Sequence, residues 1–467
     1  HPPTLRQPFS GRSPSMKTDS TKTLRVYKYR IYPTNGQIKS LDHLFYKARQ
    51  IYNLGIQIQR FAHECEHPYI SMYDLSKLLN DHDKENDFYH SGLQWNTIGA
   101  LAERIDNSYQ KYFDNIKRWK RGELTNWKLN HATGEMENFP PRPPKKKTYK
   151  GKNYFPSIPY RKSGYKLIII DPVKKKAKLK LSGVGEINLV YHRDIPDEGV
   201  IKRCIVMRRP NGKFYVAFQC EIPTPKPLEK TSRIVGIDIG IHYLLAFSDG
   251  TKPIDNEKWY VNAQKKLKRL QRKASRQRRI NNPNNFEPDF VKDGKLKKGK
   301  VKKGVRNWNI STRLKETERQ IANLHEHIAQ QRWYFWHTKT EELTRKYHLI
   351  ALEDLDTAFM RKNRKLAKFA HDAGHATFRQ MLETKAKARG VHLEFVDPKY
   401  TSQTCPECGF VHKENRKTQA NFTCLECGHH ENADIVGAKN ILKRALDAIE
   451  LRQNASLKMI DEVSVLE

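Results

Sequence analysis

Two cysteine pairs near the C-terminus constrain the fold of this chain more tightly than any other feature of the sequence. Cys405-Pro-Glu-Cys408 and Cys424-Leu-Glu-Cys427 are separated by 15 residues, and a glycine follows each pair. This spacing is typical of a tetrahedral zinc ribbon, in which four thiolates leave no open position for catalysis. We therefore expect one structural Zn²⁺, which supplies on the order of 10–16 kcal/mol to the folding of this small module.

The overall charge predicts a polyanionic partner. The chain has 467 residues, of which 87 are basic and 51 acidic, so its net charge is +36. This excess is far beyond what solubility needs. A membrane surface is the competing partner, but no run reaches the length of a spanning segment and the basic helices lack a strong apolar face. Nucleic acid is therefore favoured, and no membrane contact is expected.

The other three cysteines, Cys65, Cys204 and Cys220, are scattered along the chain. They do not form a disulfide framework, so a reducing compartment is expected. No secretory signal is visible. The Pro- and Ser-rich residues 1–15 precede Met16, and they are either an expression remnant or a flexible natural arm.

The first half of the chain reads as strands interrupted by helices. Residues 23–33 alternate apolar and basic side chains, which predicts a half-buried strand. Thr34 and Gln37 form a capping-box pattern before a long helical periodicity, and further helices are expected at 71–79 and 95–120. After an extended Pro- and Lys-rich linker at 139–152, five strands are expected at 165–170, 178–181, 186–190, 201–209 and 213–221, with a hairpin turn at Pro210-Asn-Gly212. A small β-barrel around a helical insert is the predicted arrangement.

The second half alternates strands and helices. Residues 234–250 read as two short strands, and 348–355 and 391–396 as two more. Helices are predicted at 257–279, 311–346 and 373–389, and a mobile loop is predicted at 281–304 because of its Asn, Gly and Lys content. Because two to four domains are expected at this length, we predict a second, α/β domain here.

Two of the apolar strands carry carboxylates. In 234–240, Asp238 shares a face with Gly236. An ionised group in so apolar a strand is costly unless something such as a metal ion compensates it. The second strand carries Glu353 and Asp354 on opposite faces, and alternation alone does not choose between them.

A third carboxylate, Asp434, lies in the first turn of a predicted helix. The helix dipole alone favours an aspartate at this position. Two strand carboxylates and one helix carboxylate, if brought together, would make an oxygen-rich site for two Mg²⁺ ions, with Mn²⁺ as a substitute. Ions roughly 3.5–4 Å apart activate water and stabilise the departing oxygen of a phosphodiester.

These motifs together resemble the TnpB (OrfB) proteins of insertion-sequence transposons, to which compact type V CRISPR effectors are related. The resemblance extends from about residue 22 to 447. It rests on motifs that occur in the family's order: Tyr29-Arg-Ile-Tyr-Pro33, Gly236-Ile-Asp-Ile-Gly240, Leu352-Glu-Asp-Leu355, Phe378-Arg-Gln-Met-Leu-Glu383, the two cysteine pairs, and Asp434 with Ala438-Lys-Asn-Ile441.

The resemblance implies an RNA-guided DNA endonuclease of the prokaryotic cytoplasm and nucleoid, with guide RNA and double-stranded target DNA as partners and a short adjacent motif beside the cut. It implies that Asp238, Glu353 and Asp434 are the catalytic, Mg²⁺-binding acids, which favours Glu353 over Asp354. Two residues depart from the family's pattern, Asn432 in place of an Asp and Val436 in place of an Asn.

The family also implies a domain order. A wedge β-barrel comprises 22–33 and 139–230, with a helical recognition insert at 34–138. An RNase H-like RuvC nuclease domain comprises 231–400 and 431–447, with the zinc ribbon inserted at 401–430. Residues 1–21 and 448–467 are an arm and a tail.

Several residues are candidates for contacts to nucleic acid. Motif reading is expected near Ser71–Lys77 and Tyr52-Asn53, and phosphate contacts on the basic helix, the linker and 361–368. The candidates are Tyr52, Asn53, Ser76, Lys77, Lys145, Lys146, Lys147, Lys268, Arg269, Arg272 and Arg379. An unguided, structure-selective nuclease and a DNA-binding protein with a decayed site are the competing interpretations.

Overall fold

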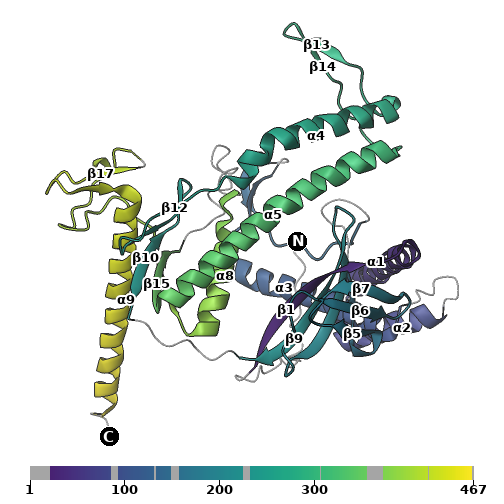
Figure 1. The fold of residues 1–467 in the computed structure, drawn as a ribbon, viewed down its shortest axis with the longest axis horizontal. Coiled ribbons are helices and arrows are strands. Elements are labelled where there is room, and N and C mark those ends of the chain that lie inside the picture. Colours follow the sequence, from purple (N-terminus) through teal and green to yellow (C-terminus); the bar gives the residue numbers. More distant parts are fainter. Residues whose placement is uncertain are drawn as a thin grey trace. The chain divides into compact units, whose positions relative to one another are not determined.

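The computed structural model describes residues 22–85, 93–130, 133–148, 157–224, 232–305, 307–354, 372–418 and 420–464. The chain divides into two compact units, His1–Thr224 and Pro225–Glu467, each with its own sheet (Figure 1). Residues 1–21 and the basic segment 361–368, for which we made predictions, lie outside the described residues. Among the described residues, no helix combines the length and the apolar character that crossing a membrane requires.

The first unit contains a seven-stranded sheet in the order β4-β8-β9-β1-β7-β6-β5. Strand β1 (Lys22–Tyr32) lies inside this sheet, antiparallel to both β9 and β7, although the helices follow it directly in sequence. The predicted hairpin is confirmed, with Gly212 at φ 83° between β8 and β9. The remaining strands are β4 (Ser157–Tyr160), β5 (Tyr165–Asp171), β6 (Lys176–Leu181), β7 (Gly185–Val190), β8 (Val200–Arg208) and β9 (Phe214–Pro223).

Three helices pack with this sheet: α1 (Asn35–Glu64), α2 (Met72–Glu85) and α3 (Trp95–Lys120). The predicted capping box is confirmed, because the Gln37 N–H donates to Thr34 Oγ1 (3.4 Å) and the Thr34 N–H donates to Gln37 Oε1 (3.0 Å). Apolar residues of the helices and of the strands belong to one buried cluster. The helical block is therefore part of the same core as the sheet. A small ribbon, β2 (Trp127–Leu129) with β3 (Met136–Asn138), follows α3.

The second unit is built on a five-stranded sheet in the order β12-β11-β10-β15-β16. Strands β10 (Ile234–Asp238), β15 (Leu349–Glu353) and β16 (His392–Val396) are parallel. Strand β11 (Tyr243–Phe247) pairs antiparallel with β10, and β12 (Ile254–Asp255) pairs antiparallel with β11. The carboxyl ends of β10 and β15 therefore meet at one edge of the sheet.

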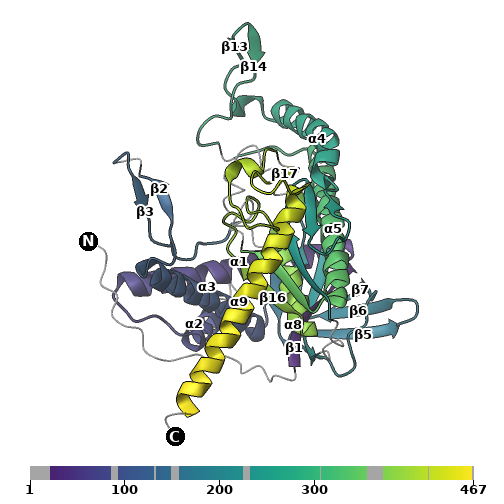
Figure 2. The ribbon, with the colours of Figure 1, turned by 90° about the vertical axis from the view of Figure 1, so that its left-hand side faces the viewer.

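Helices cover both faces of this sheet (Figure 2). Val235 and Ile237 cluster with Trp336 of α5 (Thr312–Lys346) and Phe378 of α8 (His375–Arg389). On the other face, Ala351 clusters with residues of α9 (Ala433–Ser464). The predicted alternation along the first acidic strand is thus confirmed, since its odd and even positions meet different helices.

One segment differs from its prediction. Residues 281–304, expected as a loop, form a short η2 turn (Pro283–Asn285) and a two-stranded ribbon, β13 (Phe290–Lys292) with β14 (Lys295–Lys297). Asp293 and Gly294, at φ 52° and 68°, make the connecting turn. An Asp-Gly pair is a strong hairpin signal, and it outweighs the loop-like composition around it. The ribbon joins α4 (Trp259–Asn281) to α5.

Candidate functional site

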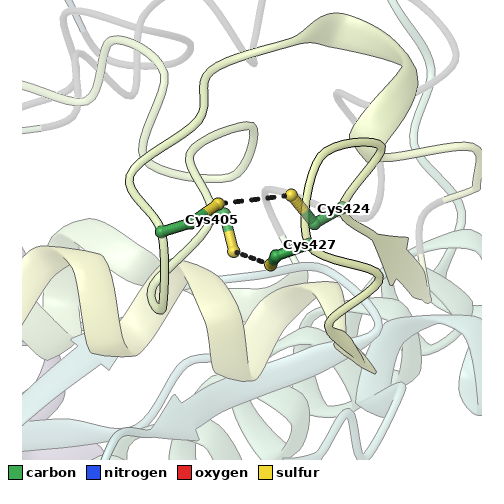
Figure 3. A group of neighbouring side chains, drawn as sticks. Cys405, Cys424 and Cys427 are labelled. Carbon is green, nitrogen blue, oxygen red and sulfur yellow. Dashed lines mark hydrogen bonds between the residues drawn. The ribbon is translucent and has the colours of Figure 1, made fainter.

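The four paired cysteines converge as their spacing predicts. Cys405 Sγ and Cys427 Sγ lie 3.6 Å apart, as do Cys408 Sγ and Cys424 Sγ. All four sulfur atoms lie within 4.8 Å of one another, and Figure 3 shows the sulfurs of three labelled cysteines turned toward a common centre. Short strands β17 (Asn421–Thr423) and β18 (His430–Asn432) flank the second pair.

This geometry fits a single metal ion. Tetrahedral sites with metal–sulfur bonds of about 2.3 Å have sulfur–sulfur edges of about 3.8 Å, close to the distances here. The distances are much longer than a disulfide bond of about 2.05 Å. Backbone N–H donors of Cys427 and Glu426 lower the pKa of Cys424 despite its burial, whereas burial and neighbouring thiols raise the pKa of Cys408 and of Cys427. It is the close approach of the four sulfur atoms that lets the group hold one metal ion.

The first two acidic residues lie at the ends of neighbouring parallel strands. Asp238 ends β10 and Glu353 ends β15, and the preceding residues, Ile237 and Leu352, are register partners. Asp434 lies in the first turn of α9, which crosses β10. The three carboxyls therefore come from two strands and one helix of the same unit.

A close approach of α9 to β10 depends on glycine. A Cβ atom placed on Gly236 would lie 2.1 Å from the backbone oxygen of Ala438 and 2.8 Å from Leu442 Cβ. A Cβ on Gly437 would lie 3.1 Å from Asp238 Oδ2. Because Gly236 has no side chain, α9 can pack directly against β10, which brings Gly437 close to Asp238.

The three carboxyl groups share one electrostatic environment. Burial first, and then the charges of Glu353 and Asp434, raise the pKa of Asp238 from 3.8 to about 8. Asp238 is half-buried and keeps some exposed surface. Burial also raises the pKa of Glu353 and of Asp434. Each of these groups resists ionisation until positive charge is near, as is typical of a cation site.

The cysteine module contacts two of the acids, which the sequence did not predict. Arg416 Nη2 lies 3.2 Å from Asp434 Oδ1, and its charge partly offsets the rise in the pKa of all three carboxyls. The Thr401 hydroxyl donates to Glu353 Oε1 (2.5 Å). Asn440 of α9 fixes this segment by donating to the backbone oxygens of Thr401 (2.8 Å) and Thr404 (2.7 Å).

The two sites differ in how closely their ligand atoms approach. Among the described residues, the four cysteines are the group whose ligand atoms come together tightly enough for one ion. Glu353 and Asp434 are near enough to raise the pKa of Asp238, but Arg416 contacts Asp434 and Thr401 contacts Glu353.

The neighbouring carboxyl Asp354 has different surroundings from Glu353. Arg379 Nη1 donates to Asp354 Oδ1 (2.8 Å), Arg379 Nε donates to Glu383 Oε1 (2.9 Å), and the guanidinium lies 4.2 Å from the Phe395 ring centroid. The Asp354 side chain is 63% exposed. Arg379, a candidate for nucleic-acid contact, therefore forms ion pairs with Asp354 and Glu383.

Two candidate contact residues of the first unit have structural partners. Tyr52 is 2% exposed and lies in the core. The Asn53 side chain binds the Lys147 backbone twice, donating to its oxygen (2.9 Å) and accepting from its N–H (2.7 Å). Arg60 donates to the backbone oxygen of Pro144 (3.0 Å). These contacts hold the Pro- and Lys-rich segment against α1.

The other candidates are mostly open to solvent. Ser76 on α2 and Lys147 are half-buried. The exposed candidates are Lys77, Lys145, Lys146, Lys268, Arg269 and Arg272. The last three lie on α4, where they alternate with the buried Leu267 and Leu270.

Three family models match the chain. A helix-turn-helix domain model of the OrfB/IS605 type matches residues 21–67, a probable transposase model (OrfB/IS605) matches 217–364, and a Cas12f1-like TNB domain model matches 375–441. Together these segments span more than half of the chain. The structure has strand β1 and the single helix α1 in the first segment, so the helix-turn-helix description does not apply to its fold here.

Curated relatives match over nearly the whole length. A "Putative RNA-guided DNA endonuclease InsQ" of Escherichia coli is 25% identical over 90% of this chain and 92% of its own. A "Putative RNA-guided DNA endonuclease" of Streptomyces pristinaespiralis is 26% identical over 91% and 90%. A "CRISPR-associated endodeoxyribonuclease Cas12f1" of Sulfoacidibacillus thermotolerans is 37% identical, but over only 18% of this chain and 20% of its own.

Solved structures align over similar lengths at low similarity. One is a Cas12f1–sgRNA–target DNA complex, which covers 90% of this chain and 99% of that one with a TM-score of 0.47 and 13% identity. This similarity is too low to establish a shared fold.

Proposed function

Because the chain belongs to the OrfB (TnpB) family of transposon-encoded proteins, we propose that it is an RNA-guided DNA endonuclease. A guide RNA pairs with one strand of the target, while the protein reads the shape of the heteroduplex and a short adjacent motif. The relatives matched over nearly their full length carry this activity in their names, which favours it over an unguided nuclease.

One observation carries the proposal beyond the family. The charges of Glu353 and Asp434 raise the pKa of Asp238, and the three residues lie on two strands and one helix of one unit. Carboxylates that oppose one another's charge fit divalent cations, and Mg²⁺ or Mn²⁺ suits oxygen ligands. When bound, two such ions supply a water of lowered pKa and stabilise the departing oxygen of the phosphodiester. The three acids hold the ions, Thr401 orients Glu353, and Arg416 balances charge beside Asp434.

The four cysteines hold one structural Zn²⁺ in this proposal. Its role is to fold the module that carries Thr401 and Arg416, and not to act on the substrate, because four thiolates leave no open coordination position. The zinc module is thereby coupled to the acidic site through two side chains.

The sheet orders support a domain assignment. Three parallel strands extended by two antiparallel ones support an RNase H-like RuvC domain over 231–400 and 431–447, with the zinc ribbon at 401–430. We assign the seven-stranded sheet to the wedge domain over 22–33 and 139–230, and the helices that follow β1 to a recognition insert at 34–138; the described strand order β4-β8-β9-β1-β7-β6-β5 contains no pairing of β4 with β5 that would close a barrel.

Exposed basic residues of both units are the proposed phosphate contacts. Lys145 and Lys146, on the segment held against α1, and Lys268, Arg269 and Arg272 of α4 extend into solvent. We keep Lys77 of α2 as a candidate for motif reading, whereas Tyr52 and Asn53 hold the protein's own structure. Exchanging α2 with that of a relative should move the motif preference, and an unchanged preference would refute this assignment.

The matches favour a transposon, rather than a CRISPR locus, as the genetic context of this protein. The CRISPR effector is more identical to this chain but matches only about a fifth of either protein. The longer matches are to proteins whose names carry no CRISPR association.

The test is to express the chain with its native flanking DNA and to sequence the RNA that stays bound at moderate salt. A discrete RNA with a constant part and one variable end supports guided cleavage. The purified particle should then cut a matching duplex in Mg²⁺, and Asp238→Ala should abolish cutting without releasing the RNA. Random RNA, or none, would refute the guided function.

A further inference from the structure

A two-stranded ribbon lies beyond the ends of α4 and α5, away from the five-stranded sheet (Figure 1, Figure 2). We propose that this ribbon, β13 with β14, docks in the major groove of duplex DNA and anchors the substrate independently of guide pairing. The inference rests on the proposed function only in taking DNA as the substrate.

The base of the ribbon is attached to α4 by side-chain contacts. Arg279, in the last turn of α4, donates to the backbone oxygen of Gly299 and pairs with Asp289 (3.5 Å). Its guanidinium lies 4.3 Å from the Phe286 ring centroid. Asp289 also accepts from the Gly299 N–H (2.9 Å) and pairs with Lys298 (2.7 Å). These contacts tie both strands to α4, so that the ribbon has a defined orientation on the helix.

Side chains below the ribbon connect it to α5 as well. Asn282 Nδ2 donates to the backbone oxygen of Asn309 (2.9 Å), and the Asn309 N–H donates back to Asn282 Oδ1 (2.6 Å). Asn281 Nδ2 donates to the hydroxyl of Ser311 (2.7 Å), which caps α5. These hydrogen bonds fix the base of the ribbon to α5 as well as to α4.

The register gives the ribbon two different faces. Phe290 pairs with Lys297, and Val291 with Leu296. Because alternate residues of a strand lie on opposite faces, Lys295, Lys297 and Phe290 share one face, and Val291 and Leu296 share the other. Lys295 and Lys297 are exposed, and no acidic side chain in the part of the chain described here lies within ion-pair distance of either. Val291 and Leu296 are 70% and 64% exposed.

The charge and shape of the ribbon favour duplex DNA as the occupant. Residues 264–303 contain 16 basic residues against three acidic ones, which complements a phosphate backbone. The major groove of B-form DNA, about 12 Å wide, admits a two-stranded ribbon, and apolar side chains contact thymine methyl groups there. The major groove of A-form RNA is too deep and narrow for such a ribbon. Duplex DNA therefore accounts for both faces of the ribbon.

The test compares Lys295→Glu/Lys297→Glu with the unaltered protein, each carrying its bound RNA. The probe is a fluorescent duplex without a guide match, titrated without Mg²⁺ at several salt concentrations. The matched control is Lys166→Glu/Lys180→Glu, an exposed pair of register partners on β5 and β6. We expect affinity to fall by on the order of tenfold or more and the slope of log affinity against log salt to fall by about 1.8, as for two lost phosphate contacts. The control variant should leave the affinity and the salt slope nearly unchanged.

Three results would overturn the inference: unchanged affinity and slope, an equal loss in the control, or loss of bound RNA with unchanged duplex affinity, which would assign the ribbon to RNA. The proposed function fails separately, through absence of a discrete bound RNA. In that case the same titration on the RNA-free protein still tests the ribbon.

Discussion

Arg416 Nη2, on the cysteine module, lies 3.2 Å from Asp434 Oδ1, in the first turn of α9. The carboxylate is 9% exposed and the arginine side chain 26% exposed, so the pair is well shielded from water. Arg416 thereby supplies positive charge beside Asp434 from the protein itself.

Removing Arg416 should therefore make the protein more dependent on divalent metal. Arg416→Ala leaves Asp434 without its partner, which should lower the stability of the metal-free protein by about 3 kcal/mol. Mg²⁺ should restore more stability than in the unaltered protein, because it binds the folded state alone. Thermal melting with and without Mg²⁺ measures this. Lys417→Ala, at the exposed neighbouring position, is the control, and an equal Mg²⁺ response in both variants would contradict the prediction.

The raised pKa of Asp238, from 3.8 to about 8, predicts a pH dependence of the metal-free protein. A carboxyl whose folded pKa exceeds its unfolded pKa stabilises the fold fully below the unfolded value and loses that contribution as pH rises to the folded value. Stability in EDTA should thus fall between about pH 4 and pH 8, by a few kcal/mol at most.

Asp238→Asn should flatten this dependence, since the amide does not ionise, and Mg²⁺ should remove it from the unaltered protein. The measurement is the free energy of unfolding by denaturant across the pH range. Asp354→Asn, which changes the exposed carboxyl beside Glu353, is the comparison. If Asp238→Asn keeps the full slope, the assignment of the pKa is incorrect.

Gly236→Ala should damage the acidic site without touching a carboxylate. The added Cβ would lie 2.1 Å from the Ala438 backbone oxygen, so α9 must move away from β10 at a cost of about 1–3 kcal/mol. DNA cleavage should fall at least tenfold at a temperature where the protein stays folded. Gly36→Ala, where nothing lies within 4 Å, should cost nothing. Full cleavage by Gly236→Ala would show that the crossing of α9 over β10 is not needed.

Disrupting the four-cysteine site should also affect the acidic site. Cys424→Ser is expected to abolish binding of the proposed Zn²⁺ and also to abolish cleavage, because Thr401 and Arg416 lose their support. Elemental analysis and a cleavage assay measure the two effects. Cys65→Ser, at an exposed cysteine outside the group, should retain both. An unchanged zinc content in Cys424→Ser would rule out the tetrahedral site.

Local patterns in the sequence predicted much of this structure. The capping pair Thr34 and Gln37, the bounds of α3 and the hairpin at Gly212 follow from short-range rules of hydrogen bonding and backbone conformation. The cysteine cluster follows from spacing alone. The preference for Glu353 over Asp354 rests on the family resemblance, because alternation along the strand treats both residues alike.

Other features depend on contacts between distant segments. Arg416 and Thr401 reach the acids only because the folded cysteine module holds them there, and neither carries a sequence signal for that role. Tyr52 was predicted to contact nucleic acid, but the fold buries its ring. The ribbon at 290–297 could have been predicted, because Asp293-Gly294 is a turn signal, but the many lysines around it favoured a loop.

The position of β1 in its sheet has a consequence for how the protein is made. Its register partners on β9 follow about 180–200 residues later in the chain. During synthesis β1 therefore leaves the ribosome long before β9, the last strand of its unit, is available for pairing. Such long-range pairing is slow. In the meantime α1, α2 and α3 emerge and can form their local hydrogen bonds. A nascent chain that ends before Pro223 therefore cannot complete the pairing of β1 with β9, and β1 keeps an open edge until synthesis has passed that residue.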